Sequence, residues 1–146
     1  MRLWPDRSGS SNLPAVDSLP AISPRLALMI GGVAAVLFGL VLLVFPSSAL
    51  SAAGLAVPTE ATVVARDVGA TLIGLGLINW MARDATGQAL RALLVGNVVV
   101  QALEFVVNLG EIIAGQVPTQ AVGGLLIHLV LGAIFVLAMR SISARS

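Results

Sequence analysis

Hydrophobic residues fill four long stretches of the chain, separated by short segments rich in glycine, proline, serine and charged residues. The first stretch, residues 26–45, contains neither a charge nor a side-chain amide. At about 1.5 Å per residue, a helix of this length spans roughly 30 Å, which is the thickness of the hydrocarbon core of a bilayer. The pattern predicts four membrane-spanning helices, at about residues 26–45, 60–82, 88–109 and 120–139.

We therefore expect an all-α integral membrane protein with a four-helix bundle over residues 25–140 and a short C-terminal tail at 141–146. Thr59 and Thr119, each directly after a proline, are predicted N-caps of the second and fourth helices. Gly110 is the predicted C-terminal glycine of the third.

Residues 1–24 form a separate segment rich in proline and serine. Two interpretations stay open. The segment is a loose tail, or it is a polyproline II stretch that lays one apolar edge on a neighbour. The second rests on apolar residues at every third position, namely Leu13, Val16, Leu19 and Ile22.

Arginine placement predicts the direction of the bundle. All eight Lys and Arg positions are arginine, and only Arg66 lies well inside a predicted span. The others lie before the first span, around the loop between the second and third, and after the last: Arg2, Arg7, Arg25, Arg83, Arg91, Arg140 and Arg145. The positive-inside rule then places both termini in the cytoplasm. A composition rich in Ala, Gly, Val and Arg is typical of a GC-rich bacterial genome. We therefore expect a multi-pass protein of the bacterial cytoplasmic (inner) membrane.

Composition narrows the chemistry. With 58% hydrophobic and 10% charged residues and a mean hydropathy of +1.01, the chain is far more apolar than a soluble domain. It has no cysteine and no lysine, which excludes thiolate and Schiff-base chemistry. A net charge of +1 without a basic patch argues against nucleic acid. No catalytic or metal-binding motif is present, so we predict no catalytic residues, no required cofactor and no enzyme activity.

One polar stripe stands out on the third span. Its members recur at spacings of four and three, which places them on one side of a helix: Asn97, Gln101, Glu104, Asn108 and Glu111. Polar groups in hydrocarbon are costly unless they face protein or water. The stripe therefore points to an interior, a cavity or a partner.

Ionisable residues on three spans are predicted to lie at similar depth in the outer half of the membrane. They are Arg66 and Asp67, Glu104 near Asn108, and His128. We expect Arg66 to pair with Glu104 or Asp67, and His128 to face the same layer. Such a layer could fix helix order, bind a ligand or cofactor, or form part of a proton or ion path.

His128 is the only histidine, and Gly124 and Gly132 lie four residues to either side. This small-residue face permits close approach of a helix or a flat ring. Helix packing is the favoured interpretation, and ligation of a haem or pigment is the alternative. The first span has glycines but no polar side chain, which predicts the most lipid-facing of the four helices or an oligomer surface.

Part of the chain resembles a known group. Residues 65–83, which read ARDVGATLIGLGLINWMAR, residues 91–97, which read RALLVGN, and Glu104 carry the resemblance. They are similar to small uncharacterised bacterial four-helix membrane proteins, loosely grouped with the DoxX-like proteins. The resemblance extends in organisation over residues 26–140. It implies a compact four-helix bundle and no particular activity.

Three functions follow as hypotheses. The first is a non-enzymatic accessory or scaffold subunit of a membrane assembly. The second is a binder of a small hydrophobic ligand, such as a lipid, quinone or pigment, at the layer of Arg66, Glu104 and His128. The third is a proton or ion pathway along the stripe. The expected partners are membrane lipid and other membrane subunits or a second copy of the chain, with no nucleic acid.

Overall fold

The computed structural model describes residues 22–143, and all regular structure in that range is helical. Four helices are long and apolar enough to cross a membrane: α1 (Pro24–Val44), α3 (Thr59–Met81), α4 (Gly87–Ile113) and α5 (Val122–Ser143). The predicted all-α, four-helix membrane bundle is confirmed, and the chain is a multi-pass membrane protein. The two interpretations of the N-terminal segment concern residues that lie almost entirely outside the described range.

The first helix has well-defined ends. The side-chain oxygen of Ser23 accepts a hydrogen bond of 3.2 Å from the backbone N–H of Leu26, and Pro24 occupies the first helical position. The helix ends at Val44, and Pro46 then begins a short helix, α2 (Pro46–Ala52), which the sequence pattern did not predict.

Three helix ends differ from the sequence predictions. Thr59 is the first residue of α3 rather than its cap, and Thr119 begins a short 3-10 helix, Thr119–Ala121, before α5. Helix α4 passes through Gly110 and ends at Ile113. The chain turns at Gly115, whose φ of +67° is in the left-handed region that glycine tolerates.

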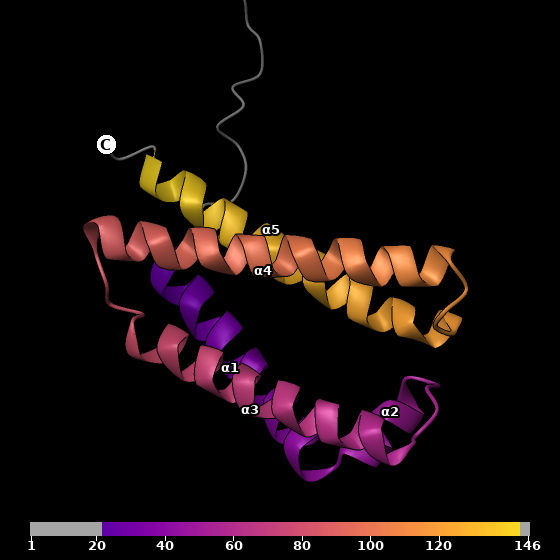
Figure 1. Ribbon diagram of the computed structural model, residues 1–146. Coiled ribbons are helices and arrows are strands. Elements are labelled where there is room, and N and C mark those ends of the chain that lie inside the picture. Colours follow the sequence, from indigo (N-terminus) through magenta and orange to yellow (C-terminus); the bar gives the residue numbers. More distant parts are fainter. Residues whose placement is uncertain (1–21, 144–146) are drawn as a thin grey trace, which may run out of the picture.

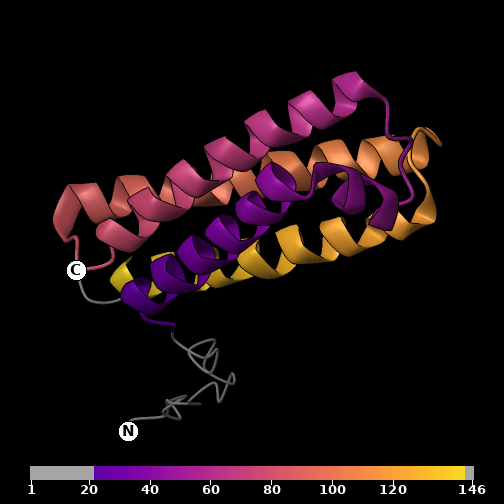
Figure 2. The same cartoon turned by 90° about the horizontal axis from the view of Figure 1, so that it is seen from below.

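The helices are arranged as two antiparallel pairs, α1 with α3 and α4 with α5 (Figure 1). The pairs meet at the end where α1 and α4 begin, and they diverge toward the end that carries α2 (Figures 1 and 2). Five fully or nearly fully buried residues form the core where the pairs meet: Ala27, Leu28, Leu94, Phe135 and Ala138. In the opposite half, the buried apolar side chains of the described range include Leu42 of α1 and Ala65 of α3.

Helix α1 is the central helix, which corrects the interpretation that the first span is the most lipid-facing; the alternative, an oligomer surface, stays a prediction. It packs along α3 and also contacts α4 and α5, and it is the most buried of the four spans. Glycines allow α1 to pack closely against α3. A Cβ atom added at Gly69 would lie 2.7 Å from the backbone oxygen of Gly39, and one at Gly32 would lie 2.9 Å from that of Gly76. The α1 and α3 backbones are therefore in direct contact.

Charged residues gather at the end where the pairs meet. Arg25 Nε lies 3.2 Å from Asp84, and Arg83 Nε lies 3.7 Å from the same carboxylate. The Arg83 guanidinium also lies 5.1 Å from the centre of the Trp80 ring. A tryptophan beside paired charges is typical of the membrane–water interface.

Candidate binding site

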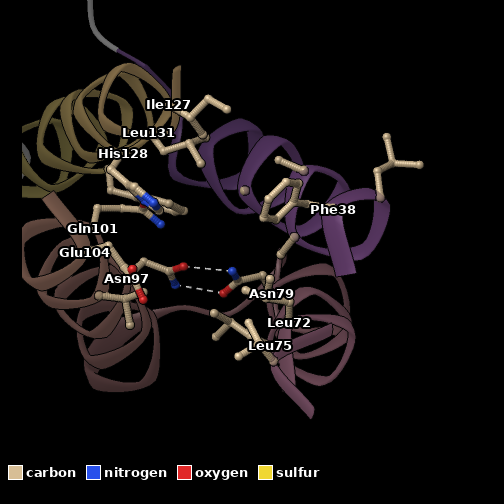
Figure 3. A pocket seen from close by; sticks show the side chains of 18 of the residues that line it. Phe38, Leu72, Leu75, Asn79, Asn97, Gln101, Glu104, Ile127, His128 and Leu131 are labelled. Carbon is tan, nitrogen blue, oxygen red and sulfur yellow. Dashed lines mark hydrogen bonds between the residues drawn. The ribbon is translucent and has the colours of Figure 1, made fainter. Parts of the chain in front are cut away.

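A cavity of about 550 Å³ lies between the two helix pairs, and all four long helices line it (Figure 3). Most of its wall is apolar. Representative lining residues are Phe38, Val68, Leu72, Leu75, Ile127 and Leu131. The cavity is partly open, and its volume is within the range of about 300–1,000 Å³ that is usual for small-molecule sites.

One part of the polar wall is a closed amide pair. Asn79 of α3 and Asn97 of α4 exchange two hydrogen bonds of 2.8 Å, and both residues are buried (Figure 3). Asn97 Nδ2 also donates to the backbone oxygen of Leu93 at 2.9 Å. The pair joins the two halves of the bundle at the base of the cavity and leaves Asn97 with no spare donor.

Removing one member of this pair should destabilise the bundle. Asn79→Leu would leave the buried amide of Asn97 without its partner, at an expected cost of about 1–3 kcal/mol. The double variant Asn79→Leu/Asn97→Leu should cost less than the sum of the two single changes. The free energy of unfolding in micelles is measured for the two single variants and the double variant. Asn108→Leu is the control, because Asn108 donates only to a backbone oxygen of its own helix. Additive effects of the two single changes would contradict the coupling.

The second part of the wall joins α4 to α5. His128 Nδ1 lies 2.8 Å from Gln101 Oε1, so the ring donates to the amide oxygen. A neutral ring with its proton on Nδ1 has Nε2 as a hydrogen-bond acceptor. A Cβ at Gly132 would lie 3.4 Å from Gln101 Cβ, and one at Gly124 would lie 3.4 Å from Asn108 Oδ1. The glycine face around His128 is thus used for packing of α4 against α5.

Glu104 is the third polar residue of the wall. It lies one helical turn beyond Gln101 and lines the cavity together with His128 (Figure 3). Its backbone oxygen accepts a 2.7 Å hydrogen bond from Asn108 Nδ2. Within residues 22–143 its carboxylate forms no ion pair. The outermost members of the stripe, Asn108 and Glu111, are half-buried and do not line the cavity.

Arg66 and Asp67 are not part of this site. The predicted ion pair of Arg66 with Glu104 or Asp67 is not formed in the described part of the chain, and both residues are exposed. Val68 and Leu72 mark the side of α3 that lines the cavity. At about 100° per residue, Arg66 is roughly 150° and Asp67 roughly 110° around the helix from the centre of that side.

The structure adds Asn79 to the site, which the polar stripe on the third span does not include. Counted from the helix ends, Asn79 is about 3 Å inside α3, whereas Asn97 is about 15 Å inside α4. The two residues meet because α4 begins beyond the end of α3 (Figure 1). Depth counted from helix ends assumes that the ends are level, and here they are not.

In the described range, no group of three His, Cys, Asp or Glu side chains is placed to hold a metal ion. The possibility of haem or pigment ligation by His128 stays a prediction, and its Nδ1 is already engaged by Gln101. The chain was compared with protein-family models, with curated proteins and with solved structures, and none of the three comparisons found a match. The similarity to DoxX-like proteins therefore also stays a prediction.

Proposed function

We propose that the protein binds one small amphipathic molecule in the membrane, a lipid or quinol whose polar end carries a hydroxyl or amine. The observation that carries the proposal is the cavity itself. Its wall is largely apolar, yet the Glu104 carboxylate and His128 line it together. In the neutral form of the ring that donates from Nδ1 to Gln101, His128 Nε2 is an acceptor, as is the carboxylate. Two hydrogen-bond acceptors in the wall favour a ligand that donates a hydrogen bond.

The first test is recovery of the ligand. The protein is purified gently from its native membrane, extracted with organic solvent and analysed by mass spectrometry. The proposal expects one compound enriched over bulk lipid, near one molecule per chain, with a donor group at its polar end. Bulk lipid in membrane proportions would contradict the proposal.

A matched pair of ligands tests the polar end. Oleyl alcohol should bind more tightly than its methyl ether, because only the alcohol donates a hydrogen bond. A bond to a charged acceptor contributes about 1.5–3 kcal/mol, so the preference should be on the order of tenfold or more. Glu104→Gln should reduce this preference several-fold, since charge-assisted bonds are roughly twice as strong as neutral ones.

Glu60→Gln is the control for that experiment, because Glu60 lies in the first turn of α3 and does not line the cavity. Binding isotherms of both ligands to both variants in nanodiscs provide the measurement. Equal affinity of the wild-type protein for alcohol and ether would contradict the proposed ligand chemistry.

The other hypotheses stay predictions. A role as an accessory subunit would appear in the same purification as large partners at fixed stoichiometry. A proton pathway would appear as flux in liposomes that Glu104→Gln abolishes. The buried amides of the stripe support a pathway less than a binding site, since Asn97 and Gln101 are engaged by Asn79 and His128.

We also propose that the membrane is the bacterial cytoplasmic membrane, with both termini in the cytoplasm. Four arginines support this orientation, because they lie at the end where α1 and α4 begin and α3 and α5 end. They are Arg25, Arg83, Arg91 and Arg140. Fusion of a reporter that is active on only one side of the membrane to the C-terminus tests it.

A further inference from the structure

We propose that two copies of this chain associate through α3, with Arg66 of each copy paired with Asp67 of the other. The starting observation is two neighbouring charged residues that form no ion pair in the described range. Arg66 and Asp67 are adjacent and exposed on a membrane-spanning helix, and neither forms an ion pair within residues 22–143. This inference is independent of the ligand proposed for the cavity.

The two charges lie within a helix that is long and apolar enough to span the membrane. They are about 10–12 Å inside α3, counted from Thr59 at 1.5 Å per residue. A long arginine side chain can extend toward the membrane surface, but the short aspartate side chain cannot. Asp67 therefore needs a cationic partner at its own depth.

Arg66 of the same chain is not that partner. Neighbours in sequence are about 100° apart on a helix and do not face each other. Thr71 Oγ1 donates to the backbone oxygen of Asp67, at 3.0 Å, and not to its carboxylate. Within residues 22–143 no cationic side chain pairs with Asp67, so we infer that the cation comes from another molecule.

A second copy of the chain supplies a cation from another molecule, and it supplies it at the depth of Asp67. In a two-fold dimer about the membrane normal, the two α3 helices run parallel, and equivalent residues lie at the same depth. Parallel helices pair a residue on one flank of the contact with a residue on the opposite flank of the partner. Arg66 and Asp67 flank a common line on α3, so each would meet its opposite charge, twice per dimer.

The surface between the two charges suits a helix contact. Residues seven apart stay within about 20° of one line on a helix, and Val63, Ala70 and Leu77 follow such a line. Val63 and Leu77 are 49% and 50% exposed. Gly74 lies beside this line, and a Cβ added there would meet nothing within 4 Å. By contrast, Gly69 is already packed against α1.

Cysteine cross-linking in membranes tests the dimer, and the absence of native cysteine removes background. Ala70→Cys lies on the proposed contact line. Leu103→Cys is the control, since Leu103 is 61% exposed on α4, away from α3. The proposal expects oxidation to give a disulfide-linked dimer at position 70 and little at position 103. Equal cross-linking at the two positions, or none at position 70, would overturn it.

Charge exchange tests the proposed pairing. In the Ala70→Cys background, Asp67→Arg should reduce cross-linking at least fivefold, because it places arginine against arginine. The exchanged variant, Arg66→Asp with Asp67→Arg, keeps the composition and should restore cross-linking. If Asp67→Arg does not accumulate in membranes, cross-linking of the exchanged variant alone tests the pairing. Its failure to cross-link would overturn the pairing.

Discussion

Gly69→Ala is expected to separate α1 from α3 and to cost the protein about 2 kcal/mol of stability, within the range for overpacked cores. The added Cβ would lie 2.7 Å from the backbone oxygen of Gly39 and 2.8 Å from the backbone nitrogen of Leu43. Backbone atoms in the middle of a helix cannot rotate aside as the end of a long side chain can. The helices must move apart, and contacts along their length weaken together.

The measurement is the free energy of unfolding in micelles, by heat or by denaturing detergent. Gly96→Ala is the matched control, because it is the same change in the interior of α4, where an added Cβ meets nothing within 4 Å. Gly96→Ala should leave stability unchanged or raise it by up to about 1 kcal/mol, through better helix propensity. Similar results for the two variants would show that the α1–α3 contact is looser than described.

Ala34→Phe is expected to remove most ligand binding. Ala34 lines the cavity on α1, and a phenyl group there would occupy volume that the ligand needs. We expect at least a tenfold loss of affinity for oleyl alcohol, equivalent to about 1.4 kcal/mol. The protein should still fold, since the added ring enters existing space rather than a packed contact.

The control is Ala133→Phe, which adds the same ring at an exposed position of α5 that does not line the cavity. Binding isotherms and the amount of co-purified ligand provide two readouts. Retained affinity in Ala34→Phe, with its fold intact, would place the ligand elsewhere and would contradict the proposed function. The charge-exchange experiment on α3 would be unaffected by that outcome.

The site shows where depth arithmetic worked and where it failed. Counting residues from helix ends gave similar depths for Glu104 and His128, and both line the cavity. The same arithmetic placed Arg66 beside them, but the side of α3 that faces α4 carries Val68 and Leu72 instead. Depth fixes one coordinate of a side chain. The direction it faces depends on which neighbour the helix packs against.

The hydrophobic pattern by itself determined the four spans. A helix satisfies its backbone polar groups within its own segment, and each apolar stretch is long enough for one helix to cross the hydrocarbon core. It also placed the polar stripe on one side of α4, through the 3.6-residue period. Tertiary structure alone decided that α1 is central, since the sequence marks its glycines but not the helix they contact. It likewise decided that Asn79 meets Asn97 and that the stripe opens into a cavity, because both follow from how far α4 extends beyond α3 and how the two pairs diverge.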